Sequence, residues 1–234
     1  MKAKRGWPGS PAGFIEVVPR PFDREIIADL QTMETGMATI FPRPFAIGQC
    51  PVTNEQFLRF IQATKYVPGD EDSLSCQMFL AHWEGGAMPP ADILTHPVTF
   101  VSYDDALACA LWIGGRLPRY EEWLYAAHSG RNTRFPWGDV FSPAVCNVRE
   151  GGVGGTTPVG QYSPDGDSAM GCVDMVGNVW EWTSEAVGEE CDLLVAMGPG
   201  WDHPSFQSEI VRDRSYRNHS VGFRVTRGAC PPYE

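Results

Sequence analysis

The sequence predicts one α+β domain, built from short helices and strands that many turns connect. Its 234 residues suit a single irregular domain, and 43% hydrophobic with 20% charged residues is a globular composition. The 25 glycines and 20 prolines mark frequent turns, and the 8 tryptophans and 12 phenylalanines favour aromatic packing over a helical bundle. No repeat, linker or low-complexity tract divides the chain. We therefore expect a single domain over residues 1–234.

Two helices are predicted at capping boxes, in which an N-cap side chain and another three residues later bond to each other's backbone N–H groups. The first begins at Thr53 with Gln56, and the second at Ser102 with Asp105. Apolar residues then follow at helical spacing, namely Phe57, Phe60 and Ile61 in the first helix and Leu107, Ala110 and Leu111 in the second. We expect the glycine pair at 114–115 to end the second helix.

A third helix is expected over about 119–128, with Trp123, Leu124 and Ala127 facing inward. Arg119 stands at its N-cap and has no side-chain oxygen to accept the first backbone N–H bonds. Short strands are expected at five apolar runs, residues 14–18, 45–48, 96–101, 177–183 and 221–225.

The charge of the chain limits its partners. A net charge of −11 without a basic stripe argues against nucleic acid and anionic membranes, because both attract clustered Lys and Arg. No run approaches the ~20 apolar residues of a spanning helix. Lys2, Lys4 and Arg5 precede Pro8 and Gly9 rather than an apolar run, so no signal peptide is expected. We therefore expect a cytoplasmic protein with no nucleic-acid or membrane partner.

The cysteines give no sign of a disulfide framework. They are odd in number and scattered, and no CxxC occurs. Their positions are Cys50, Cys76, Cys109, Cys146, Cys172, Cys191 and Cys230. We expect most of them to be reduced, buried thiols that act as small hydrophobic residues.

Five motifs stand in order along the chain. They are PVTNEQF at 51–57, a run from HPVTF to AAHSG at 96–130, FPWGD at 135–139, GNVWEW at 177–182 and VGFRV at 221–225. Their sequences and order resemble those of the formylglycine-generating-enzyme (sulfatase-modifying-factor) family, and the resemblance covers residues 51–225. It implies an elaborated C-type-lectin-like fold with long loops and little regular secondary structure. That fold hosts oxidases, maturation factors and pure binding modules, so it does not by itself assign a function.

The resemblance stops at the cysteine pair that the family's oxidase uses to bind copper(I), a metal that favours soft thiolate ligands. In the family these cysteines lie between a glycine-rich motif, here residues 198–201, and the closing GFR. Counting onward from 198–201 places them at His203 and Ser208. No cysteine lies between Cys191 and Cys230. We therefore expect no thiol–copper oxidase chemistry, and no catalytic residue is assigned.

The family's substrate groove remains the expected ligand site. Six residues are expected to line it: Trp180, Trp201, Asp202, His203, Ser208 and Arg214. Trp180 matches a tryptophan that lines the family's groove. His203 follows a carboxylate, so it could hold a metal or act as a general base, or it could be a surface histidine. Arg214 could bind a carboxylate, or it could pack and form salt bridges under the groove.

The resemblance also implies structural calcium. The matching ligands of one site are the side chains of Asp174 and Glu181 with the carbonyls of Gly177 and Val179, a set of the hard oxygen donors that calcium prefers. The alternative is a plain glycine turn that enters a strand. A second family site matches the Asn147 side chain and the Val148 carbonyl, but Gly151 stands in the place of its aspartate.

Three functions follow from these observations. The first is a recognition or maturation-accessory module that holds a peptide or small molecule in the family's groove. The second is a thiol-independent oxidoreductase on the same fold, with an unknown catalytic metal. The third is a retroelement-diversified ligand-binding protein, although residues 211–220 contain few of the Asn, Tyr and Ser residues that such a protein varies. Loss of both cysteines places the recognition function first.

Overall fold

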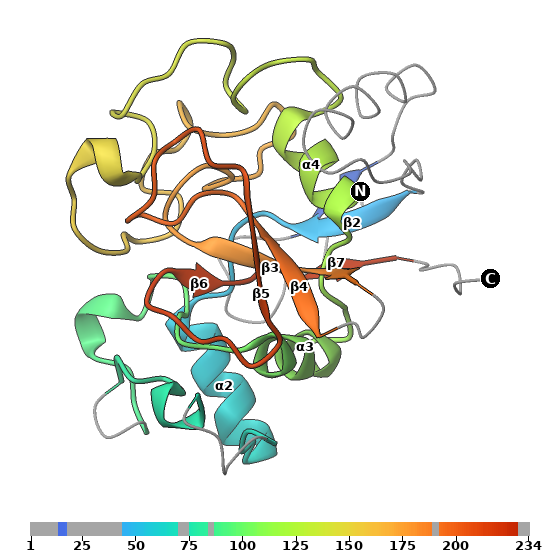
Figure 1. Ribbon diagram of the computed structural model, residues 1–234, viewed down its shortest axis with the longest axis vertical. Coiled ribbons are helices and arrows are strands. Elements are labelled where there is room, and N and C mark those ends of the chain that lie inside the picture. The colour runs from blue at the N-terminus through green and yellow to red at the C-terminus, as the bar shows by residue number, and fades with distance from the viewer. Residues whose placement is uncertain (1–13, 18–43, 70–74, 84–86, 189–191, 229–234) are drawn as a thin grey trace, which may run out of the picture.

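The computed structural model describes residues 14–17, 44–69, 75–83, 87–188 and 192–228. Its elements are short and are joined by long loops (Figure 1). The strands are β1 Phe14–Val17, β2 Phe45–Gly48, β3 Trp180–Val187, β4 Leu193–Met197, β5 Glu209–Asp213, β6 Val221–Gly222 and β7 Thr226–Arg227. The α-helices are α2 Asn54–Thr64, α3 Tyr103–Trp112 and α4 Tyr120–His128. Single 3-10 turns lie at Cys76–Met78, Ala91–Ile93 and Arg149–Gly151.

The strands form two small sheets. β1, β2 and β7 make an antiparallel sheet in that order, and a second sheet has the order β5-β4-β3-β6. Within the second sheet β6 runs parallel to β3, so Trp180 pairs with Val221 and Glu181 with Gly222. This pairing sets the GNVWEW and GFR motifs side by side at the centre of the molecule. The α+β class expected from the sequence is confirmed.

The first two helices begin at the predicted capping boxes. The Thr53 hydroxyl accepts from the Gln56 N–H, and the Gln56 side chain accepts from the Thr53 N–H. Ser102 and Asp105 form the same pair of bonds at the start of α3. The buried face of α3 differs from the expected one, because Ala106 and Cys109 lie in the core with Ala110, whereas Leu111 is 61% exposed.

The third helix forms despite its arginine N-cap. Arg119 makes no capping bond through its side chain, but its backbone N–H donates to the Glu122 carboxylate at 2.9 Å. The same carboxylate binds both terminal nitrogens of Arg116, at 2.6 and 2.7 Å. Trp123, Leu124 and Ala127 are buried, as their spacing predicted.

The strand predicted at 96–101 is wrong. Val98 donates its N–H to the Val52 carbonyl, but Phe100 has a φ of 55° and donates its N–H to the Asn218 carbonyl. A left-handed residue breaks the extended conformation, so this run is a loop that forms backbone hydrogen bonds with two distant segments. The same cause shortens the run at 177–183, because Gly177 and Asn178 have positive φ and the strand starts at Trp180.

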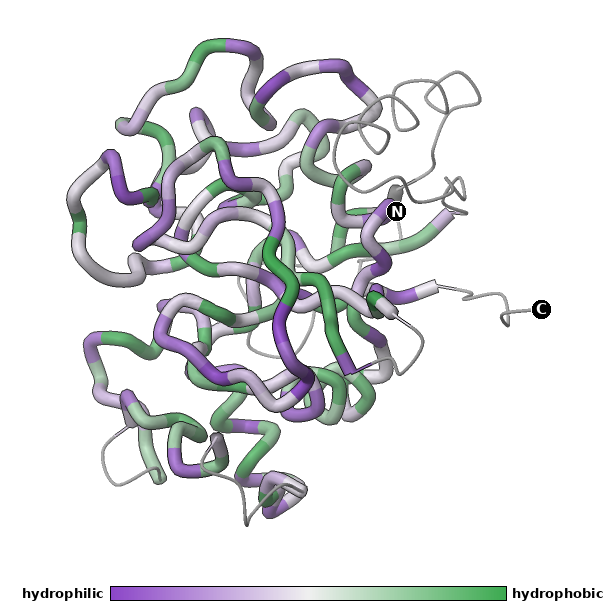
Figure 2. Tube along the Cα trace, in the orientation of Figure 1, coloured by the Kyte–Doolittle hydropathy of each residue, from purple (hydrophilic) through white to green (hydrophobic). Residues whose placement is uncertain are grey.

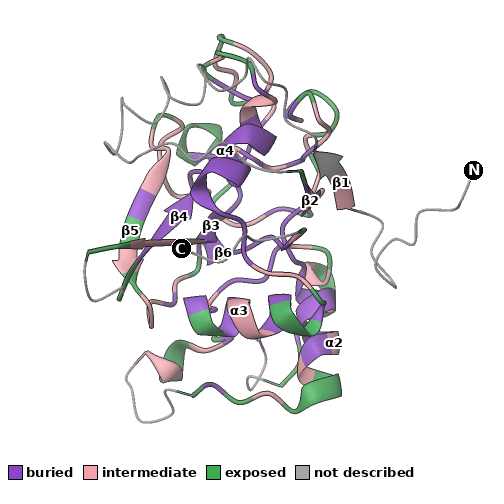
Figure 3. Ribbon diagram, turned by 90° about the vertical axis from the view of Figure 1, so that its right-hand side faces the viewer, coloured by how far each residue is buried: buried purple, intermediate pink, exposed green. Residues whose placement is uncertain are grey.

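Two hydrophobic clusters fill the interior. One lies between α2, α3 and the β3 sheet, and the other joins α4 to β2 and β4. Hydrophobic residues follow β4 through the middle of the molecule (Figure 2), and α4 is buried along most of its length (Figure 3). The largest polar group inside is the Arg224 guanidinium, which is completely buried against Glu181.

Candidate functional site

A hydrogen-bonded cluster forms around the carboxylate of Asp202. Its Oδ1 lies 2.7 Å from Nδ1 of His203, and its Oδ2 lies 3.0 Å from Nε2 of His219. Burial by itself would raise the pKa of Asp202, but hydrogen bonds from His203 and Ser220 and the attraction of His203 lower it below its ordinary value. Asp202 is therefore a carboxylate at neutral pH, held between two imidazoles.

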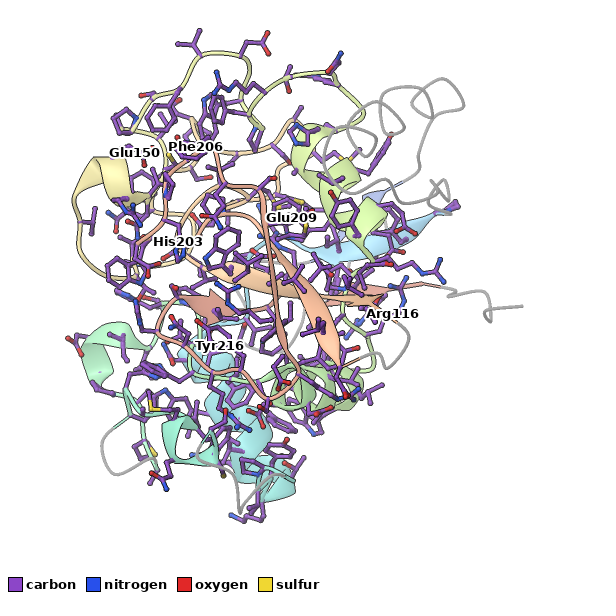
Figure 4. The ribbon with its side chains drawn as sticks, viewed as in Figure 1. Arg116, Glu150, His203, Phe206, Glu209 and Tyr216 are labelled. Atoms are coloured by element: carbon purple, nitrogen blue, oxygen red, sulfur yellow. The ribbon has the colours of Figure 1, made fainter. Side chains whose placement is uncertain are left out.

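The loop that carries this cluster, residues 198–208, is fixed from outside. Arg149 donates its Nε–H to the Asp202 carbonyl at 2.8 Å and its backbone N–H to the His203 carbonyl. Glu150 accepts from both the N–H and the hydroxyl of Ser205. Gly200 allows the close approach, since a Cβ there would stand 2.8 Å from the Ser220 side chain. Figure 4 shows Glu150, His203 and Phe206 on this side of the molecule.

The cluster borders a cleft of about 310 Å³, which we name the histidine cleft. Its lining includes His82, Asp92, Phe100, Thr156, Trp201 and His219. The centre of the His219 ring lies 5.1 Å from that of the Trp201 ring and 6.4 Å from that of the Phe100 ring. The Phe100 ring in turn stacks on the His82 ring, with their centres 5.4 Å apart. The cleft is therefore walled by flat rings.

Four of the chain's five histidines line this cleft or are joined to its lining by hydrogen bonds. His82 and His219 line it, His96 contacts Thr156 through Nδ1 at 3.0 Å, and His203 shares Asp202 with His219. No local sequence pattern predicted this gathering, because the four positions span residues 82–219. His82, Phe100 and His219 are the site residues that sequence reasoning missed.

The imidazoles on the inner side of the cleft are neutral. Burial lowers the pKa of His82 to about 4, and burial also lowers the pKa of His96. Nε2 of His82 lies 2.9 Å from the Asn54 side-chain oxygen, which also accepts from Trp83 at 2.8 Å. Asp92 lines the cleft and the Asp202 carboxylate lies beside it, and these two imidazoles add no positive charge to balance them.

The structure gathers only three of the six predicted groove residues. Trp201 lines the histidine cleft, and Asp202 and His203 lie beside it, joined to His219 through the Asp202 carboxylate. Trp180 does not line a groove, because its side chain is completely buried under the loop, with Nε1 3.2 Å from Nδ1 of His203. Nδ1 of His203 faces both the Trp180 N–H and the Asp202 carboxylate. It accepts a hydrogen bond from Trp180 when it carries no proton and donates one to Asp202 when it carries a proton, so it cannot do both at once.

The remaining two residues lie elsewhere. Ser208 lines a separate cavity of about 440 Å³ between α4 and residues 198–208. The side chain of Arg214 lies against the first residues of α3. Two of its nitrogens bind the Asp104 carboxylate, and its Cζ atom lies 5.0 Å from the centre of the Tyr103 ring. Its side chain therefore has the packing and salt-bridging role that was the alternative to carboxylate binding.

The residues of the first expected calcium site do not fit an ion held by both carboxylates. Both Glu181 oxygens bind Arg224, at 2.5 and 2.7 Å, and one also accepts from the Trp123 indole at 2.7 Å. Asp174 is partly buried, accepts the Gly160 N–H, and its pKa is raised to about 6, chiefly by desolvation. The Glu181 charge is already neutralised, so only Asp174 retains unused charge.

The second expected calcium site offers one unused oxygen. Oδ1 of Asn147 is buried and has no hydrogen-bond partner among the described residues, which is the kind of atom that an ion would satisfy. The Val148 carbonyl accepts the Gly151 N–H, and the Gly177 backbone passes directly against Asn147. Glu150, which stands just before the position of the missing aspartate, binds Ser205 instead. Calcium therefore stays a prediction at both positions.

Other metal and thiol chemistry finds little support among the described residues. They contain no group of three or more His, Cys, Asp or Glu side chains arranged to hold a metal ion. The two imidazoles of the Asp202 cluster bond to different oxygens and do not converge on one point. Burial raises the pKa of the Cys50 and Cys146 thiols to about 12 and that of Cys172 to about 11, so these are not thiolates. No helix in the described part of the chain could cross a membrane.

Comparison with known sequences gives consistent matches. The model of the sulfatase-modifying factor enzyme 1-like domain matches residues 11–229. Inactive C-alpha-formylglycine-generating enzyme 2 of Bos taurus is 32% identical over 240 residues, covering 81% of this chain and 79% of that protein. Hercynine oxygenase of Mycolicibacterium thermoresistibile is 35% identical over 208 residues, covering 79% of this chain but only 43% of that protein.

Two solved structures share the fold. PvdO from Pseudomonas aeruginosa superposes with a TM-score of 0.65 at 24% identity, covering 94% of this chain and 92% of that one. Treponema denticola variable protein 1 superposes with a TM-score of 0.59 at 14% identity, covering 79% of this chain and 84% of that one. At these identities the likeness concerns architecture alone.

Proposed function

This chain belongs to the family of sulfatase-modifying factor enzyme 1-like domains, and on that premise we propose that it is a ligand-recognition protein. Its site is the histidine cleft, and its ligand is a small molecule or a peptide side chain. The observation that carries the proposal is the Asp202 carboxylate, held by His203 and His219 beside the Trp201 ring at the edge of the cleft.

The chemistry of the cleft suits binding more than thiol oxidation. The positions that match the family's cysteines hold His203 and Ser208, and these two residues line different surfaces. Flat rings give a large apolar contact area while ordering few rotamers, and a fixed carboxylate selects for a hydrogen-bond donor or a cation. The name of the Bos taurus relative, an inactive enzyme, is consistent with a non-catalytic member.

A binding screen tests the proposal. Compounds and short peptides that raise the melting temperature would be titrated by calorimetry against the wild type and a Trp201→Ala/His219→Ala double variant. We expect these ligands to lose about tenfold in affinity, since each aromatic contact that the double variant removes contributes roughly 0.5–1.5 kcal/mol. Phe206→Ala is the matched control, because it removes an exposed ring from the other cavity. Ligands that bind the double variant normally would rule the cleft out.

A second assay tests the absence of family chemistry. We expect no aldehyde in a Cys-x-Pro-x-Arg peptide after incubation with this protein, with or without copper, because no cysteine lies between Cys191 and Cys230. Aldehyde-specific labelling that depends on the protein would contradict this.

A thiol-independent oxidoreductase is the second candidate. Two imidazoles on one carboxylate could move a proton, and one relative is named an oxygenase, although this chain covers less than half of it. Substrate-dependent oxygen consumption that His203→Ala abolishes would favour it. The variable-protein alternative has only the shared architecture in its favour, which carries no function.

A further inference from the structure

The 3-10 turn Ala91–Ile93 brings a second carboxylate to the histidine cleft. Asp92 lines the cleft and is exposed. Its side chain makes no hydrogen bond or salt bridge with the described residues, although its charge acts against the burial that lowers the pKa of His96. Each oxygen of Asp202, by contrast, already bonds to an imidazole. Of these two carboxylates, Asp92 is therefore the one whose oxygens are available to a ligand.

The turn that carries Asp92 is fixed to the neighbouring helix. Asn54, the buried first residue of α2, donates from its side-chain nitrogen to the Ile93 carbonyl at 3.0 Å. The side-chain oxygen of the same residue lies 2.9 Å from Nε2 of His82, which lines the cleft. One buried side chain thus ties the turn with Asp92 to the wall of rings. The backbone that positions the carboxylate is ordered before a ligand binds, which lowers the entropy cost of binding.

Little positive charge opposes a cation in the cleft. No lysine or arginine is among the described residues that line it. Burial lowers the pKa of His82 to about 4, so this imidazole is neutral at pH 7. Arg149 bonds to the Asp202 carbonyl, but it does not line the cleft. The chain as a whole has a net charge of −11, which also favours the approach of a cation.

The aromatic rings supply the apolar part of the site. Trp201 and Phe100 line the cleft and are partly exposed. Such faces stack on the flat ring of a ligand, and they also attract a cation within about 6 Å of their centres, Trp most strongly. At about 310 Å³ the cleft has room for one ring with a short side chain, at the lower end of the ~300–1,000 Å³ of small-molecule sites.

We propose that the histidine cleft binds an arylalkylammonium ion, which is a flat ring joined by a short chain to a protonated amine. The ammonium group donates to the Asp92 carboxylate, and the ring packs on Trp201. An anion would be repelled by both carboxylates, and a neutral ligand of the same shape would keep only the ring contacts. This inference rests on the proposed function, because it names the ligand class of the same site.

The experiment compares two probes of one shape, 2-phenylethylamine and 2-phenylethanol, by calorimetric titration of the full chain at pH 7.5. The amine is protonated at this pH, as the amine of lysine is. We expect it to bind about tenfold more tightly than the alcohol, because it adds an ion pair and a cation–π attraction. Asp92→Asn should weaken the amine roughly threefold to fivefold, as for an exposed pair, and leave the alcohol unchanged. Asp92→Glu should keep most of the preference.

Asp165→Asn is the matched control, since it removes the same charge from an exposed carboxylate that does not line the cleft. Far-ultraviolet circular dichroism checks that each variant is folded. The inference is wrong if Asp92→Asn keeps the full preference for the amine, or if Asp165→Asn reduces that preference as much. It is also wrong if the wild type binds neither probe up to its solubility limit.

A third titration separates this inference from the proposed function. If the wild type binds both probes equally and the Trp201→Ala/His219→Ala double variant weakens both, the choice of a cation is wrong and the cleft remains the binding site. If both probes bind the double variant as tightly as the wild type, the cleft is not their site, and both the inference and the proposed function are contradicted.

Discussion

Two carboxylates of this protein, Glu181 and Asp202, each bind basic side chains but have opposite surroundings. Glu181 and its partner Arg224 are completely buried, and Arg224 also donates to the carbonyls of Gly48 and Val173. Asp202 and its partner His203 keep about a quarter of their side chains exposed and border a cleft. The first group ties strands together, and the second is open to a ligand.

The contrast between these two carboxylates shows which parts of the molecule the family motifs build. Glu181 belongs to GNVWEW and Arg224 to GFR, so the segments that identify the family build the interior of the fold. Asp202 and His219 lie outside those motifs and decide the chemistry of the surface. Resemblance to a family therefore predicted the architecture better than it predicted the site.

The largest expected effect comes from breaking the buried pair. Arg224→Met leaves the Glu181 charge unpaired in the core, and we expect a loss of about 3–5 kcal/mol in the free energy of unfolding, measured by urea denaturation. Adding Glu181→Gln should restore part of that loss, because it removes the uncompensated charge. A double variant no more stable than Arg224→Met would show that the guanidinium acts through its carbonyl bonds instead.

The second prediction concerns Asp174, which lies beside this buried pair. Its folded pKa of about 6 is above the unfolded value, so the fold is favoured by protonation, and this contribution is lost as pH rises from about 4 to 6. In chelator at pH 7.5, Asp174→Asn should therefore raise the free energy of unfolding by about 2–3 kcal/mol. The Gly160 N–H keeps an acceptor in the variant.

Bound calcium would reverse the sign of the effect that Asp174→Asn has on the free energy of unfolding. If an ion binds Asp174, calcium at a hundredfold excess over Kd should stabilise the wild type by roughly 2.7 kcal/mol, and Asp174→Asn should lose this stabilisation. Melting curves with calcium and with chelator separate the two cases. Curves of the wild type that do not respond to calcium would contradict a structural ion at this turn.

The smallest effect is expected at the cleft. Asp202→Asn should change the free energy of unfolding at pH 7 by no more than about 1 kcal/mol, because its partners are partly exposed. The folded pKa of Asp202 is below its unfolded value, so its contribution is present above the unfolded value near 4 and is lost as pH falls through the folded pKa. The same variant should weaken binding of any cleft ligand. A loss of stability as large as that of Arg224→Met would remove the contrast between the two carboxylates.

The sequence by itself determined the local structure and the class of fold. Capping boxes and helical spacing depend on residues three or four positions apart, so α2, α3 and α4 could be read directly. The family motifs then supplied the architecture. The absence of cysteine after Cys191 and before Cys230 led to the prediction, without any structure, that the family's thiol chemistry is lacking.

Only the tertiary structure decided the site. The 96–101 run has a strand-like sequence, but Val98 bonds to Val52, and Phe100 bonds to Asn218 in a left-handed conformation and stacks on His82. His219 reaches Asp202 because residues 198–208 and the segment before β6 pack against each other, and Trp180 is buried because β3 lies at the centre of its sheet. These contacts join residues far apart in sequence, and they depend on the packing of the whole domain, which no local pattern encodes.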